Sequence, residues 1–149
     1  MNASRQRFSA DLLSLVAQIA VLFRAEFAGA VPDFNPWLTD AETEAQADPT
    51  SVDISFALPR SCTHFASYCI LMRVKFSDRL RAIDCRLSTI ELTGYDYKGQ
   101  RWQFTTAHDW QFKGEQLPTV IDQQKLYHIC RQIFSLFSYP ARLRIDRSC

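Results

Sequence analysis

The stretch RWQFTTAHDWQF, residues 101–112, decides the fold, because large apolar and polar side chains alternate along it. A period of two is typical of a β-strand with one apolar and one polar face, and it excludes an α-helix. Each aromatic ring removes about 150–250 Å² from water when it is buried, so the stretch predicts one long strand beneath a covering layer. Its apolar face would carry Trp102, Phe104, Thr106, His108, Trp110 and Phe112.

Helical periodicity marks both ends of the chain. Apolar residues recur at spacings of three and four near the N-terminus, which predicts an amphipathic helix over about residues 9–28 that ends at Gly29. A similar stripe predicts a second helix over about residues 120–137. Thr119 is its expected N-cap, with the Asp122 carboxylate at the positive end of the helix dipole.

Between the helices, residues 52–58, 68–76 and 80–93 alternate as strands do. The alternation falters near Ser88, where a β-bulge would switch the face. Gly99 can supply the positive φ of a hairpin turn that leads into residues 101–112.

This order of elements predicts an α+β protein with one curved antiparallel sheet of about four strands. A long N-terminal and a long C-terminal helix would cover the sheet. At 149 residues and 47% apolar, residues 1–149 are expected to form one globular domain. An acidic linker over about residues 29–50 would join the first helix to the sheet, because residues 26–53 hold seven acidic residues and no lysine or arginine.

The five cysteines favour reduced thiols over a disulfide framework, because three of them lie inside apolar periodic stretches and the total is odd. A cytoplasmic location is therefore expected. No metal is expected, since the Cys and His residues lack the paired spacing of zinc sites. No cofactor motif is found. The apolar run near the N-terminus is too short to span a bilayer, so no transmembrane segment is expected.

Basic residues gather on two predicted strands and the turn between them. With nearby tyrosines, they would form a cationic track of the kind that binds single-stranded nucleic acid. The net charge of +1 argues against a purely electrostatic nucleic-acid binder, so a solvated sheet face, or one that docks an acidic protein partner, is preferred. The expected contact residues are Arg73, Lys75, Arg81, Arg86 and Arg101, with Trp37 as an aromatic anchor.

His108 and Trp110 support a different hypothesis, in which sheet and helix enclose a ligand pocket or an enzymatic site. An imidazole among rings could act as a general base there, and Asp84 or Glu91 could approach it across the sheet. No nucleophile is tied to His108 by a recognisable spacing, so a histidine at the rim of the core is the simpler interpretation.

The sequence therefore favours a non-catalytic protein–protein interaction module, such as an adaptor, assembly factor or regulator. The alternatives are a cone-shaped α+β roll with His108 in its pocket, and a single-stranded nucleic-acid binder that uses the basic stripe from Arg73 to Arg86. A homodimer formed through a sheet edge is also open.

Overall fold

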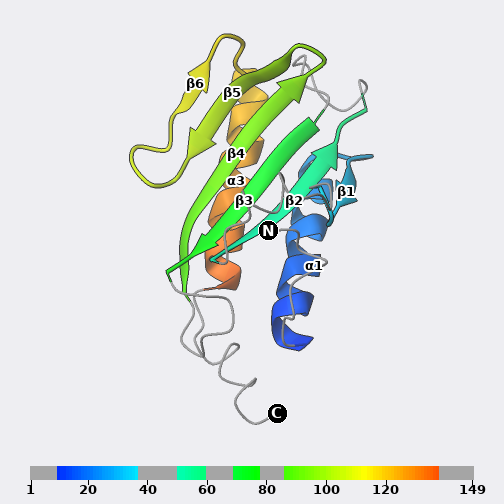
Figure 1. The fold of residues 1–149 in the computed structure, drawn as a ribbon, viewed down its shortest axis with the longest axis vertical. Helices are drawn as coiled ribbons and strands as arrows, with labels where there is room; N and C mark the ends of the chain where they lie inside the picture. The colour runs from blue at the N-terminus through cyan, green and yellow to red at the C-terminus, as the bar shows by residue number, and fades with distance from the viewer. Residues whose placement is uncertain (1–9, 37–49, 60–68, 78–85, 138–149) are drawn as a thin grey trace, which may run out of the picture.

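The computed structural model describes residues 10–36, 50–59, 69–77 and 86–137. These residues form two helices, α1 (Ala10–Glu26) and α3 (Val120–Leu136). They also form six strands, which are β1 (Val31–Asp33), β2 (Ser51–Ala57), β3 (Cys69–Phe76), β4 (Leu87–Asp96), β5 (Gly99–Thr105) and β6 (Phe112–Gly114). Each strand pairs antiparallel with the next one in the chain (Figure 1). The predicted α+β class with an antiparallel sheet and two helices is confirmed, but the prediction of about four strands is wrong.

The first additional strand, β6, comes from the stretch that was expected to form one long strand. Strand β5 ends at Thr105, the chain turns through residues 106–111, and β6 returns beside β5. The return places Phe112 opposite Phe104, with ring centroids 4.6 Å apart. Trp110 has a φ of 55° in this loop, a conformation that interrupts any strand. The two phenylalanines thus share a face, as predicted, although a hairpin separates them.

The second additional strand, β1, begins the segment that was expected to be a linker. Pro32 at its centre lies opposite Phe56 of β2. Proline has no N–H to donate, so it is tolerated at this position because β1 is the edge of the sheet. Residues 37–49, which include Trp37, lie outside the described residues.

The predicted hairpin and bulge are both confirmed. Lys75 pairs with Thr89 while Phe76 pairs with Leu87, which leaves Ser88 as the extra residue of a bulge. At the β4–β5 turn, Gly99 has a φ of 115°. The first part of the predicted third strand, residues 80–85, lies outside the described residues.

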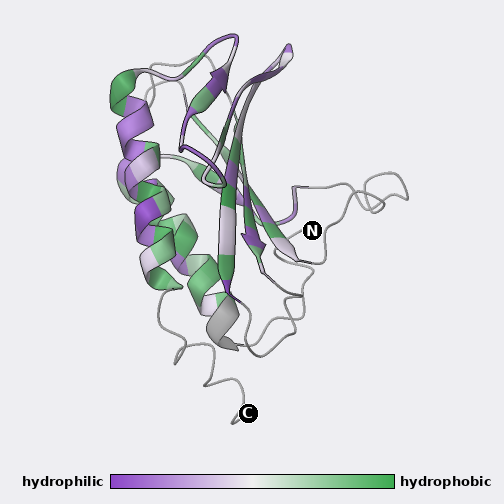
Figure 2. Ribbon diagram, turned by 90° about the vertical axis from the view of Figure 1, so that its left-hand side faces the viewer, coloured by the Kyte–Doolittle hydropathy of each residue, from purple (hydrophilic) through white to green (hydrophobic). Residues whose placement is uncertain are grey.

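Both helices lie side by side on the same side of the sheet (Figure 2). Phe23 of α1 stacks on Phe56 of β2 with ring centroids 3.8 Å apart, and Tyr127 of α3 meets Phe104 of β5 at 5.6 Å. Alternate strand side chains point into this layer and are fully buried, including Ile54, Ile70, Met72, Ile90, Leu92 and Trp102. These buried side chains form the core between the sheet and the two helices.

The helix ends follow their sequence signals. Gly29 takes a φ of 86° after α1, a conformation that glycine adopts without a steric penalty. At the start of α3, the Thr119 hydroxyl accepts a hydrogen bond of 3.2 Å from the backbone N–H of Asp122. The predicted N-cap is therefore confirmed. Neither helix, within the described part of the chain, is long and apolar enough to cross a membrane.

Candidate functional site

The sheet face that points away from the helices carries charged side chains in register. Asp53, Arg73 and Glu91 lie directly opposite one another on β2, β3 and β4. Arg73 donates from Nε and Nη2 to both oxygens of Asp53, at 2.8 and 3.0 Å, and the Asp53 side chain is fully buried. Lys75 and Glu91 form a second ion pair at 3.1 Å, in which both side chains are about one third exposed. This part of the outer face is therefore charge-balanced.

Arg101 is also held by acidic and amide groups. Its Nε lies 3.3 Å from an oxygen of Asp96, and its Nη1 donates to Glu115 at 3.3 Å. Its Nη2 donates to the Gln116 side chain at the same distance. Arg86 is exposed, whereas the expected contact residue Arg81 lies outside the described residues. Three of the five expected basic contact residues are thus ion-paired within the chain.

A hollow of about 330 Å³ lies farther along the same outer face, over β4, β5 and β6. Thr93, Gln103 and Lys113 form one row across its floor, because register pairs Thr93 with Gln103 and Gln103 with Lys113. Glu91 and Thr105 form the next row. The 106–111 loop adds His108, Asp109 and Gln111 as a wall.

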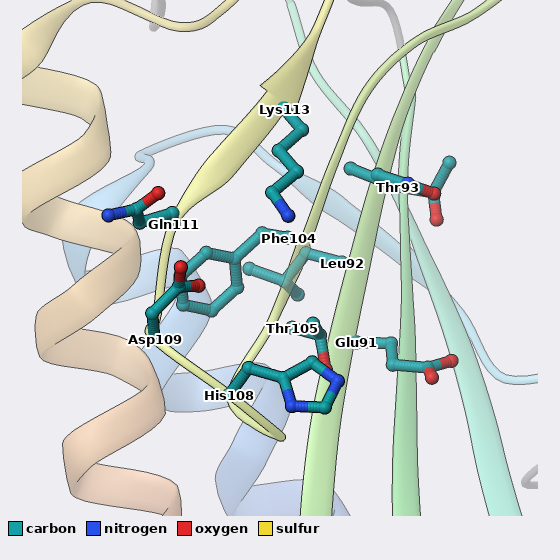
Figure 3. Close-up of a pocket in the computed structure, with 10 residues that line it drawn as sticks. Glu91, Leu92, Thr93, Phe104, Thr105, His108, Asp109, Gln111 and Lys113 are labelled. Carbon is teal, nitrogen blue, oxygen red and sulfur yellow. The ribbon is translucent and has the colours of Figure 1, made fainter.

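The charged groups of the hollow point in different directions (Figure 3). Lys113 extends from β6 toward the middle of the residues that line the hollow. The Glu91 carboxylate turns away toward β3, where it forms the ion pair with Lys75. The Gln103 side-chain oxygen accepts a hydrogen bond from Gln100 at 3.3 Å, which leaves its amide N–H groups as donors. The middle of the hollow therefore presents the Lys113 ammonium, and Gln103 lies in the same row on the neighbouring strand.

The two residues of the pocket hypothesis separate in the structure. His108 is exposed on the loop and lines the outer hollow. Glu91, one of the two carboxylate residues that were expected to approach His108, lines the same hollow. Trp110 turns to the helix side instead, where it packs against Phe104 at 6.0 Å and Phe134 at 5.9 Å between ring centroids. His108 lies in the loop because β5 ends at Thr105, before the chain reaches it.

The two described cysteines are free thiols. Burial raises the pKa of Cys69, although a hydrogen bond with Ser55 partly opposes that shift. Burial raises the pKa of Cys130 to about 12. Neither thiol lines the hollow, and the described residues contain no group of three or more His, Cys, Asp or Glu side chains that could hold a metal ion.

Sequence reasoning missed most of the hollow. Its floor consists of single polar residues on three strands, and only the pairing of β5 with β6 brings Lys113 next to Gln103. The one usable signal was the polar side of the alternation in residues 101–112, which marked an outer face without revealing its neighbours. The missed residues are Thr93, Gln103, Thr105, Asp109, Gln111 and Lys113.

Comparison with known families places this architecture in a wider group. The chain belongs to a family that is described as a domain of unknown function, which matches residues 4–139 and so includes both helices and the whole sheet. Searches of curated proteins and of solved structures find no match.

Proposed function

We propose that this chain is a non-catalytic protein interaction module that binds an acidic segment of a partner protein in the outer hollow. The observation that carries the proposal is the position of Lys113. Its ammonium extends toward the middle of the hollow, and no carboxylate of the described residues pairs with it. An ammonium beside amide and hydroxyl donors favours a carboxylate ligand, because hydrogen bonds with an ionised partner are about twice as strong as neutral ones.

The polar lining of the hollow and its position on an open sheet face support a protein ligand. Small-molecule pockets typically enclose about 300–1,000 Å³ and are mostly apolar, whereas this hollow is at the lower end of that range and has a lining that is more polar than apolar. It lies on an open sheet face, where a partner segment can continue beyond it. One or two side chains of an acidic partner would fit. We place the module in the cytoplasm, in keeping with the free thiols of Cys69 and Cys130.

Affinity capture from native extract tests the proposal with two charge-matched variants. Lys113→Glu reverses the charge inside the hollow, and Lys98→Glu makes the same change at the exposed tip of the β4–β5 hairpin. We expect a set of acidic proteins that the wild-type chain and Lys98→Glu capture and that Lys113→Glu loses. Capture that is the same for both variants would contradict a role for the hollow.

Binding of a small polar ligand is the second candidate, because His108 lines the hollow together with two carboxylate residues, Glu91 and Asp109. Screening small acids and amines by NMR would detect it through shifts of the side-chain amides of Gln103 and Gln111. A small ligand that binds here and is not displaced by an acidic peptide would favour this candidate. A random single-stranded oligonucleotide belongs in the same screen, since salt-dependent binding that Arg86→Ala weakens would favour the nucleic-acid alternative.

A further inference from the structure

Among the described strands, β1 and β6 form the two edges of the sheet, and these edges differ in the hydrogen-bond donors that they offer (Figure 1). In an antiparallel pair of strands, opposed residues that exchange two backbone hydrogen bonds alternate with opposed residues that exchange none. One known bond therefore fixes, along each strand, which residues direct their backbone N–H and C=O groups toward a given neighbour.

At the β1 edge, a proline occupies the outward position. Phe76 of β3 donates from its backbone N–H to the Thr50 carbonyl at 2.8 Å, beside the first pair of the β2–β3 ladder. Every second residue from Thr50 therefore faces β3, so the backbone groups of Ser55 and Ala57 face β1, where the opposed residues point back at them. Pro32 lies between those residues, and its backbone faces outward. Because proline has no N–H, this edge offers a further strand no donor at its centre.

At the β6 edge, the same reasoning gives the opposite result. Thr106 donates from its backbone N–H to the Ile90 carbonyl at 3.1 Å, beside the β4–β5 ladder. Every second residue of β5 from this pair, which includes Phe104 and Trp102, therefore directs its backbone groups toward β4. Gln103 lies between those two residues, so its backbone N–H and C=O face β6.

Strand β6 thus presents two donors at its outer side. Lys113 lies opposite Gln103 and points its backbone groups back at β5. Phe112 and Gly114 flank Lys113, so their N–H and C=O groups point away from β5. No other strand of the described chain pairs with β6, so these groups form an open edge. A segment of a partner protein can add a strand to such an edge.

The two faces of β6 offer different side chains to an added strand. On the outer face, Lys113 extends its ammonium toward the middle of the hollow (Figure 3). On the inner face, the Phe112 ring packs against Tyr127 of α3, with ring centroids 5.5 Å apart, and Tyr127 is only partly buried. Successive side chains of a strand point to opposite faces, so every second residue of an added strand would meet the ammonium and the others would meet the rings.

We propose that the acidic partner segment binds in an extended conformation along β6 as an added antiparallel strand, in which carboxylate residues alternate with apolar ones. This inference rests on the proposed function, because Lys113 attracts the same carboxylates in both. A carboxylate residue opposite Lys113 would occupy a non-hydrogen-bonded pair, in which the side chains are closest. The apolar residues on either side would exchange backbone hydrogen bonds with Phe112 and Gly114 and cover the rings.

Charge favours an acidic segment over a second copy of this chain as the occupant. Two β6 strands that paired antiparallel about Lys113 would bring two ammonium groups directly opposite each other, and like charges in that position are destabilising. A lysine on an edge strand is a common means of preventing such pairing between copies. A glutamate or aspartate in the added strand turns the same contact into an attraction.

Isomeric N-methylated peptides test the pairing. The probe is a labelled synthetic peptide of four valine–glutamate repeats, and its binding is followed by fluorescence anisotropy with up to about 1 mM protein, which detects a Kd between about 1 µM and 1 mM. Methyl groups on the valine nitrogens remove the N–H groups that would face Phe112 and Gly114, whereas methyl groups on the glutamate nitrogens point away from β6. We expect valine methylation to weaken binding at least about tenfold and glutamate methylation to weaken it much less.

The outcomes distinguish this inference from the proposed function. Binding that Lys113→Glu abolishes, that the matched control Lys98→Glu keeps, and that valine methylation leaves unchanged would overturn the added strand while the acidic ligand stands. A Kd that Lys113→Glu leaves unchanged would contradict the acidic ligand and therefore both proposals. A wild-type chain that does not bind the unmethylated peptide at about 1 mM would overturn the added strand, and the capture experiment would still decide the proposed function.

Amide hydrogen exchange locates the added strand directly. With the unmethylated peptide at ten times its Kd, the amides of Phe112 and Gly114 should exchange about tenfold more slowly, because the bound peptide covers them for that share of the time. The amides of Val31 and Asp33, in the β1 edge, should keep their rates. Unchanged exchange at Phe112 and Gly114 with bound peptide would overturn the inference.

Discussion

Arg73 donates two hydrogen bonds to the carboxylate of Asp53 across the β2–β3 pair, at 2.8 and 3.0 Å. The Asp53 side chain is fully buried, whereas Arg73 remains 24% exposed. Removal of the guanidinium would leave a carboxylate charge in a site that is shielded from water, which typically costs about 3–5 kcal/mol. We therefore expect Arg73→Met to lower the free energy of unfolding by several kcal/mol in a urea titration.

Lys75→Met is the matched control for this prediction. Lys75 also pairs with a carboxylate on the neighbouring strand, Glu91, but both groups of that pair are about one third exposed. Exposed pairs contribute about 0–1 kcal/mol, so Lys75→Met should change stability little. Similar losses from the two variants would contradict the structural role assigned to the buried pair.

Gly94 and Trp102 lie opposite each other on β4 and β5, and the indole covers the glycine. A Cβ atom at position 94 would overlap Nε1 of Trp102. The indole is almost fully buried, and the Phe112 ring packs against it at 5.3 Å, so it has little room to withdraw. Gly94→Ala should therefore destabilise the protein by about 1–3 kcal/mol, as overpacking of a core does.

A double-mutant cycle with Trp102→Phe checks the cause of this loss. The smaller ring removes the atoms that an alanine at position 94 would meet, so the double variant should lose less stability than the sum of the single variants. We expect a coupling of at least about 0.5 kcal/mol. Additive losses would show that Gly94 is needed for a reason other than contact with Trp102.

Thr119 caps α3 through the hydrogen bond that its hydroxyl accepts from the N–H of Asp122. Thr119→Ala removes this acceptor and should lower the free energy of unfolding by about 1 kcal/mol. Thr119→Ser keeps the hydroxyl, so its loss in the same chemical denaturation experiment should be well below that of alanine. Equal losses would mean that the threonine methyl group, and not the cap, stabilises the helix start.

The sequence predicted those elements whose signals are local. Helix α1 ends before Gly29, α3 begins after its Thr119 cap, and the β4–β5 turn contains Gly99, so each boundary carries a residue with a conformational preference. The Ser88 bulge could also be predicted from a local signal, because one extra residue interrupts the alternation of apolar and polar side chains.

The β5–β6 hairpin was not predictable from such signals. Its loop holds no glycine or proline, and Trp110 adopts a positive φ that tryptophan rarely takes. Both Phe104 and Phe112 also stay on the buried face, since the loop preserves the alternation across the reversal. One long strand and this hairpin would therefore show the same alternation in sequence. Only the hairpin pairs β6 with β5, and that pairing forms the floor of the hollow.

Cys130 links stability to pH through its buried thiol on α3. Burial raises the pKa of this thiol to about 12 from its ordinary value of about 9, because the thiolate would lose its hydration in the core. Between these two values the unfolded chain has released the proton and the folded chain still holds it. The free energy of unfolding is therefore expected to fall as pH rises above about 9, by up to about 1.4 kcal/mol per pH unit. Below about pH 9 the thiol is protonated in both states, so no stability is lost at this position.

Cys130→Ala isolates this effect from the tyrosines and lysines that titrate in the same range. The variant has a small cavity and a lower stability at every pH, so the slopes are compared and not the levels. Urea titrations between about pH 8.5 and pH 10.5 should give a shallower decline for Cys130→Ala than for the wild-type chain, because only the wild-type chain gains a proton-linked penalty at this position. Parallel declines would mean that the folded chain accommodates the Cys130 thiolate, in conflict with its position in the core between α3 and the sheet.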